Sequence, residues 1–91
     1  IENEQIINFS SLYPNPVKDV AVLEFNSSKN TNISIAIYDI FGRQLSTSSI
    51  RISIGNNKIN LETSKLANGY YLVNASCDEG EFKKTIQFTK Q

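Results

Sequence analysis

Few residues in this chain are of the types that carry out chemistry. Its 91 residues contain no histidine, which removes the usual general base and the commonest zinc ligand. Cys77 is the single cysteine, and it has no neighbouring cation on its strand to stabilise a thiolate. The hydroxyl-rich stretch from Ser46 to Ser49 lacks a base that could activate a nucleophile. We therefore expect no enzymatic activity and interpret Cys77 as a small buried hydrophobic residue.

The densest group of carboxylates is Asp78, Glu79 and Glu81. A calcium ion takes six or more oxygen ligands in an ordered loop, and this cluster lacks that ligand spacing. We interpret it as a solvated turn and expect neither a metal nor a cofactor.

Charge and hydropathy exclude several classes of partner. Nine Lys and Arg balance nine Asp and Glu, and the basic residues are scattered from Lys18 to Lys90, so we expect no binding to nucleic acid or to an acidic membrane. No apolar run approaches the ~20 residues of a transmembrane helix, which predicts no transmembrane segment. The chain starts at Ile1 and contains no Met. This indicates a piece of a longer precursor whose leader peptide lies upstream.

Apolar residues alternate along most of the chain, which predicts one all-β domain. About seven strands with turn signals every 8–12 residues or so favour an immunoglobulin-like antiparallel β-sandwich. The clearest alternation, Ile33, Ile35 and Ile37, should share one core with Tyr71 and Val73. We expect residues 1–10 to be a linker remnant with the start of the first strand, and residues 11–91 to be the domain. The expected extended segments are 5–9, 20–25, 33–38, 43–47, 50–54, 58–61, 71–77 and 82–90.

Several connections between these segments can be predicted. Residues 50–54 either continue the strand that begins at Arg43 or form its neighbour. Gly55, Asn56 and Asn57 should break the chain, and residues 63–66 have the composition of a short helical turn.

The first of three turn motifs is Tyr13-Pro14-Asn15-Pro16. Neither proline has an N–H to donate to a sheet, so the first strand must end there. Asn15 followed by Pro16 suits the first two positions of a type I turn through Lys18.

The second motif runs from Asp39 to Arg43 and predicts a hairpin turn. An Asp side chain can accept hydrogen bonds from the turn backbone, and Gly42 can adopt a positive φ. Arg43 should lie at the surface, paired with a nearby carboxylate or carbonyl.

The third motif is Leu66-Ala67-Asn68-Gly69-Tyr70-Tyr71. In immunoglobulin-like sandwiches a tyrosine near the start of the penultimate strand bonds through its hydroxyl to backbone a few residues upstream, an arrangement called the tyrosine corner. Tyr71 fits that role. Tyr70 points the other way and is the better candidate for an exposed contact.

The order and spacing of these motifs resemble the C-terminal sorting domain of the type IX secretion system. The family's last strand, apolar with recurrent lysines, is similar to residues 83–90. Two positions depart from the family pattern, because Phe41 stands at a commonly polar turn position and Tyr70 at a position that is commonly smaller and β-branched. Both should add exposed aromatic surface.

The resemblance implies a non-catalytic signal that is recognised in the folded state. It implies an N-terminally attached cargo, passage through the periplasm of a Gram-negative bacterium, contact with the type IX machinery and its sortase-like surface protease, and delivery to the cell surface or medium. The lysines near the C-terminus would contribute charge that a partner reads. The motif and recognition residues implied are Pro14, Asn15, Pro16, Asp39, Gly42, Arg43, Gly69, Tyr70, Tyr71, Lys83, Lys84 and Lys90.

Two alternative functions remain open at the level of sequence. One is a fibronectin-like or immunoglobulin-like spacer or adhesive module of a secreted protein. The other is a carbohydrate-binding module, although such modules usually present a flat aromatic platform and this chain has no Trp.

Overall fold

The computed structural model of the chain describes residues 7–77 and 83–91, with the backbone alone described for residues 7–10. These residues form seven strands in two antiparallel sheets and no helix, which confirms the all-β sandwich. No helix that could span a bilayer is found in this part of the chain. The strands are β1 (Ile7–Tyr13), β2 (Val20–Ser27), β3 (Thr31–Asp39), β4 (Gln44–Ile52), β5 (Gly55–Glu62), β6 (Gly69–Cys77) and β7 (Lys83–Lys90).

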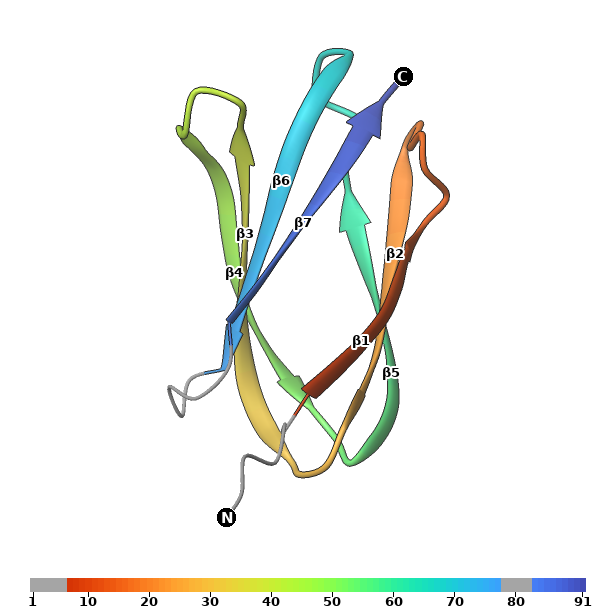
Figure 1. Cartoon of the computed structure of the whole chain (residues 1–91), viewed down its shortest axis with the longest axis vertical. Coiled ribbons are helices and arrows are strands. Elements are labelled where there is room, and N and C mark those ends of the chain that lie inside the picture. The colour runs from red at the N-terminus through yellow and green to blue at the C-terminus, as the bar shows by residue number, and fades with distance from the viewer. Residues whose placement is uncertain (1–6, 78–82) are drawn as a thin grey trace.

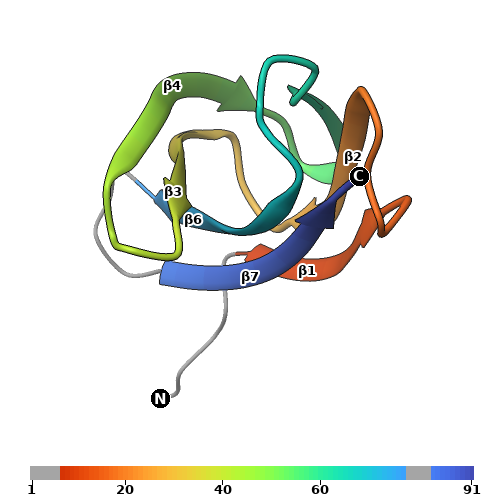
Figure 2. The same ribbon diagram turned by 90° about the horizontal axis from the view of Figure 1, so that it is seen from above.

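The two sheets have the strand orders β1-β2-β5 and β4-β3-β6-β7. The edge strands β1 and β7 lie on one side of the sandwich and β4 on the opposite side (Figures 1 and 2). Connections β1–β2, β3–β4 and β5–β6 lie at the same end of the molecule as the C-terminus (Figure 1). This end carries the three turn motifs.

Alternation of side chains builds the core between the sheets. In β3 every second residue from Thr31 to Asp39 is buried, and in β6 the same holds from Tyr71 to Cys77. This confirms the predicted burial of Ile33, Ile35, Ile37, Tyr71, Val73 and Cys77. The other sheet contributes Ala21, Leu23, Phe25, Ile59 and Leu61.

The structure decides the connections that the sequence left open. Residues 44–52 form the single strand β4, so Ile50 and Ile52 continue the strand that leaves the Arg43 turn. The predicted break at Gly55, Asn56 and Asn57 is wrong, because these residues begin β5 and pair with Ser27, Asn26 and Phe25.

The chain reverses instead at Ser53 and Ile54. There the Asn57 side chain accepts from the Ser53 N–H at 3.3 Å and donates to the Ser53 carbonyl at 2.9 Å. The predicted short helical turn at residues 63–66 is a single turn, in which the Leu66 N–H donates to the Thr63 carbonyl at 3.0 Å.

The first strand ends at Tyr13, as the prolines require. Residues 15–18 do not form the predicted hydrogen-bonded turn. Val17 instead forms an isolated parallel bridge with Lys90, so its backbone bonds go to β7. The acidic cluster at Asp78, Glu79 and Glu81 lies outside the described residues.

Candidate functional site

The Asp39 carboxylate organises the β3–β4 turn. Its Oδ1 accepts from the backbone N–H groups of Phe41 and Arg43, both at 2.9 Å, and its Oδ2 accepts from Arg43 Nε at 2.7 Å. The Gly42 N–H donates to the Asp39 carbonyl at 3.1 Å. The predicted capping role of Asp39 and the predicted pairing of Arg43 are both confirmed. The side chain of Asp39 is nearly buried, whereas that of Arg43 is 76% exposed.

Gly42 has a φ of +86°, which confirms the predicted positive φ. A Cβ at this position would have no neighbour within 4 Å, so a substitution is opposed by backbone conformation alone. We expect Gly42→Val to lower the free energy of unfolding by about 1–2 kcal/mol. Gly42→Asn should cost less, since Asn tolerates the left-handed region. The exposed neighbour Phe41, changed to Ser, serves as the control at under about 0.5 kcal/mol. Equal urea midpoints for Gly42→Val and Phe41→Ser would contradict this ranking.

The hydrogen bonds to Asp39 set a pH dependence. The backbone N–H of Arg43, then its guanidinium and the Phe41 N–H, hold the pKa of the Asp39 carboxyl below its usual value, against the opposing effect of burial. The folded chain therefore binds this proton less tightly than the unfolded chain does. The resulting stabilisation is complete above about pH 4 and is lost as the pH falls through the folded pKa.

We expect Asp39→Asn to remove this contribution. Urea unfolding between about pH 2 and pH 6 should show a shallower loss of stability on acidification for the variant than for the wild type. Parallel pH profiles for the two proteins would show that Asp39 is not the titrating group.

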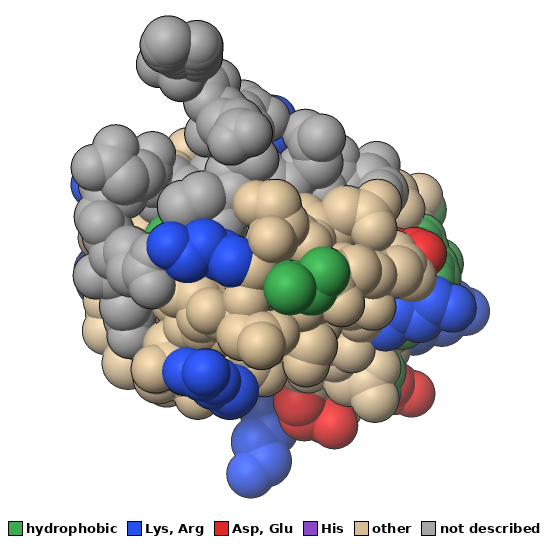
Figure 3. Space-filling model, turned by 90° about the horizontal axis from the view of Figure 1, so that it is seen from below, with side chains coloured by type: hydrophobic (Ala, Val, Ile, Leu, Met, Phe, Trp, Pro, Cys, Tyr) green, Lys and Arg blue, Asp and Glu red, His purple; other side chains and the backbone are tan. Residues whose placement is uncertain are grey.

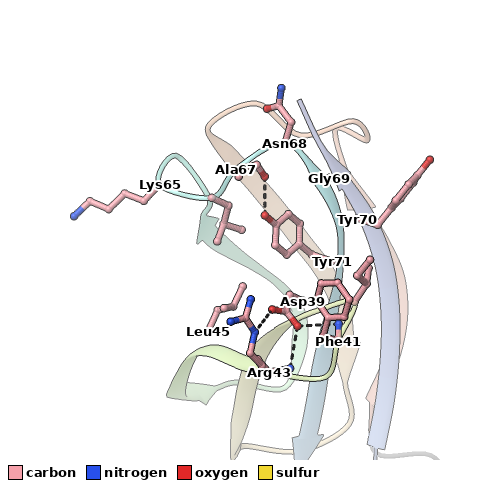
Figure 4. A pocket seen from close by; sticks show the side chains of 12 residues that line it. Asp39, Phe41, Arg43, Leu45, Lys65, Ala67, Asn68, Gly69, Tyr70 and Tyr71 are labelled. Atoms are coloured by element: carbon pink, nitrogen blue, oxygen red, sulfur yellow. Dashed lines mark hydrogen bonds and ion pairs between the residues drawn. The ribbon is translucent and has the colours of Figure 1, made fainter.

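Tyr71 forms the predicted tyrosine corner. Its hydroxyl donates to the Ala67 carbonyl at 2.6 Å, and its ring stacks on Phe88 with 5.6 Å between centroids. Tyr71 is 8% exposed, whereas the adjacent Tyr70 is 57% exposed on the other face of the sheet. The close view shows Tyr71 pointing inward and Tyr70 away from the pocket (Figure 4). The expected exposure of Tyr70 is confirmed.

The first motif is tied to the end of β7. Asn15 Oδ1 accepts from the Thr89 N–H at 3.0 Å. The Val17 N–H donates to the Thr89 carbonyl at 2.7 Å, and its carbonyl accepts from Gln91 at 2.8 Å. Val17 is completely buried. The Pro14 and Pro16 region is thereby held against the last strand, 74 positions away in sequence.

Lys90 differs from the other two lysines of the last strand. It is only 6% exposed, and its Nζ donates to the Leu66 carbonyl at 3.2 Å. Lys83 and Lys84 are exposed, whereas Lys90 joins β7 to the third motif. Lys83 lies seven residue steps of extended strand, roughly 23 Å, from Lys90.

These contacts bring the motifs to one end of the sandwich, here called the motif end: residues 14–19, 39–45, 63–71 and 88–91. A pocket of about 380 Å³ lies there between the second and third motifs. Asp39 and Arg43 stand at its base and Tyr71 on its wall (Figure 4). Its lining residues are Asp39, Ile40, Phe41, Arg43, Leu45, Lys65, Leu66, Ala67, Asn68, Gly69, Tyr70 and Tyr71.

Exposed apolar side chains surround this pocket. Phe41 is 79% exposed, Ile40 63% and Leu45 41%. The expected exposure of Phe41 is therefore confirmed, whereas Ile40, Leu45 and Lys65 were not predicted as site residues. Ile40 could have been found from its place between Asp39 and Gly42, because a turn residue has no core to enter.

The opposite end of the molecule has a different surface. It presents mainly backbone and neutral polar side chains, with separated basic and acidic side chains and little hydrophobic surface (Figure 3). The described part of the chain contains no group of three or more His, Cys, Asp or Glu that could hold a metal ion. The motif end, in contrast, exposes the apolar side chains of Ile40 and Phe41 beside the Arg43 guanidinium.

Two solved structures show the same fold. Latent PorU from Porphyromonas gingivalis, crystallised as a dimer, matches 92% of this chain with a TM-score of 0.75 and 19% identity. A β-glucuronidase from Parabacteroides merdae matches 93% of it with a TM-score of 0.54 and 9% identity. The chain spans only 9% and 13% of the lengths of these two proteins. No curated protein sequence matches it.

Family membership follows from the sequence itself. Residues 11–89 match the family model of the secretion system C-terminal sorting domain. That range includes the three motifs and nearly all of β7. The chain therefore belongs to the C-terminal sorting domain family, the non-catalytic signals that direct attached cargo through the type IX secretion system.

Proposed function

We propose that the type IX apparatus recognises this domain in its folded state through the motif end. The observation that carries the proposal is that three motifs, distant in sequence, lie at one end of the sandwich, where the second and third surround one pocket and the first is tied to the end of β7. A cargo attached at the N-terminal side would travel with the domain through the periplasm to the cell surface or medium. The sortase-like surface protease would then separate cargo from signal. Residues 11–91 are the proposed extent of the domain.

The motif residues divide into two groups by their contacts. Asp39, Gly42 and Tyr71 build the turns, and Asn15 and Lys90 tie them to β7. Their proposed contribution to recognition is indirect, because they fix the shape of the motif end. The exposed residues held between them, Ile40, Phe41, Arg43 and Tyr70, would make the contacts.

The exposed apolar residues also bear on the two alternative functions. A solvent-facing Phe and Ile in adjacent turn positions form the kind of patch that marks a site of protein contact. A spacer needs no such patch. A carbohydrate module needs a flat aromatic platform, whereas Tyr70 points away from the pocket that Phe41 lines, so these two rings do not form one (Figure 4).

The experiment fuses residues 1–91 to the C-terminus of an exported reporter in a host with a working type IX apparatus. We expect the reporter at the cell surface or in the medium, and in the periplasm when the apparatus is deleted. A folded wild-type fusion that stays in the periplasm of the competent host would refute the sorting function of this chain.

A matched pair of variants tests the motif end. Ile40, at 63% exposure, lies at the motif end, and Ile54, at 65% exposure, lies in the β4–β5 turn at the other end. Ile40→Ser should reduce export several-fold and Ile54→Ser should not, with both melting temperatures unchanged within a few degrees. Equal export of the two variants would contradict recognition through the motif end.

A further inference from the structure

The Arg43 guanidinium is oriented by the protein but only partly used by it. Its Nε donates to Asp39 Oδ2 at 2.7 Å. Among the described residues, this ion pair is the one hydrogen-bonded contact of the Arg43 side chain. The side chain is 76% exposed. A guanidinium has five N–H donors in a planar fork, so the terminal nitrogens remain available to a ligand. Because Asp39 fixes the Nε edge, less side-chain entropy is lost when a partner binds.

Asp39 bonds to the Nε of Arg43 and not to its terminal nitrogens. Its two carboxylate oxygens already accept three hydrogen bonds, two from the backbone of the turn and one from Arg43 Nε. No other carboxylate lines the pocket, whereas Lys65 adds a second cation. The lining therefore carries a net charge of about +1, which favours an anionic ligand.

The pocket geometry favours a carboxylate over a larger anion. The Lys65 side chain extends away from the pocket, so its ammonium does not converge with the Arg43 guanidinium (Figure 4). A single guanidinium fork can form two parallel hydrogen bonds with either anion, which uses both oxygens of a carboxylate but leaves the remaining charged oxygens of a phosphate without a donor here. The neighbouring Phe41 and Leu45 offer apolar contact beside that site and would exclude water from it.

We propose that Arg43 binds the carboxylate of an acidic side chain on a partner protein, with an adjacent apolar side chain of the partner packing on Phe41 and Leu45. This inference rests on the proposed function, since it names the chemistry of the partner at the motif end. The partner surface is therefore an Asp or Glu beside an aromatic or aliphatic residue.

The first test measures ligand chemistry on the wild-type 91-residue chain. Terminally blocked Phe-Asp and Phe-Asn dipeptides and inorganic phosphate are titrated separately while NMR follows the Arg43 Nε–H and the Phe41 amide. We expect the chemical shifts to saturate with Phe-Asp. The isosteric Phe-Asn should bind at least about tenfold more weakly, because a charge-assisted hydrogen bond is lost. Equal shifts with the two dipeptides would overturn the carboxylate site. Shifts with phosphate as large as those with Phe-Asp would overturn the choice of carboxylate.

The second test uses the reporter fusion. Arg43→Lys keeps the charge but loses the planar fork, and Arg51→Lys makes the same change at an exposed arginine near the other end of β4. We expect export to fall about tenfold for Arg43→Lys and to stay unchanged for Arg51→Lys, with similar melting temperatures. Normal export of Arg43→Lys together with impaired export of Ile40→Ser would overturn the carboxylate site and leave the proposed function intact. Normal export of both Arg43→Lys and Ile40→Ser would also contradict the proposed recognition through the motif end.

Discussion

Deleting residues 83–91 is expected to leave a chain that does not fold. The deletion removes β7, whose Phe88 is 1% exposed and stacks on Tyr71. It also removes the backbone partners of the buried Val17. Losing one buried Phe side chain alone costs about 3–5 kcal/mol, and a domain of this size has little more stability than that. The edge of β6 would in addition be left unpaired.

Circular dichroism and thermal melting of the truncated chain provide the measurement. We expect no cooperative transition, and no export of the truncated reporter fusion. A cooperative melt near the wild-type temperature would show that β7 is dispensable for folding. If the truncated chain is unfolded and is not exported, the loss of export has two possible causes, which are unfolding and the loss of a recognised charge.

A double variant separates these two causes. Lys83 and Lys84 are exposed, so changing both to Ala should leave the melting temperature within a few degrees of the wild type. Reduced export of this folded variant would mean that the charge of β7 is read. Lys90 is excluded from the variant because its ammonium bonds to the Leu66 carbonyl and its loss would disturb the motif end.

The fold could be predicted where local pattern and burial agree. Ile33, Ile35 and Ile37 alternate because one face of β3 packs against the other sheet. Such a period of two can be recognised directly in the amino-acid sequence. The Asp39–Gly42 turn was predictable for a similar reason, since its contacts all lie within five residues. Tyr71 adds a bond to Ala67, only four positions away.

The features that could not be predicted from the sequence depend on contacts between residues that are distant in the chain. Gly55 and Asn57 have turn chemistry but pair with Ser27 and Phe25 of β2, so tertiary pairing overrides local propensity. The burial of Lys90 requires the Leu66 carbonyl, 24 positions away. The pocket likewise exists only because β3 and β6 are neighbours, which places the second and third motifs together.

Replacing Ile35 by Ala is expected to lower the free energy of unfolding by about 2–5 kcal/mol, because the side chain is 2% exposed in the centre of β3. For a chain of this length that corresponds to a drop in melting temperature of at least about 8 °C. Ile54→Ala is the matched control, since it removes the same atoms from a residue that is 65% exposed. Its cost should stay below about 0.5 kcal/mol. Indistinguishable melting curves for the two variants would contradict the assigned core.

The position of Ile35 within the core also predicts a ranking. Ile35 lines a groove of about 290 Å³ between β4 and β5, together with Ser46, Ser48 and Leu61. Its loss would leave a space that water and the small side chains of β4 can partly fill. Ile33 is completely buried and does not line that groove, so the cavity left by Ile33→Ala can relax less. Ile33→Ala should therefore destabilise the domain more than Ile35→Ala, and the reverse order in urea unfolding would show that the β4 side of the core is as tightly packed as its centre.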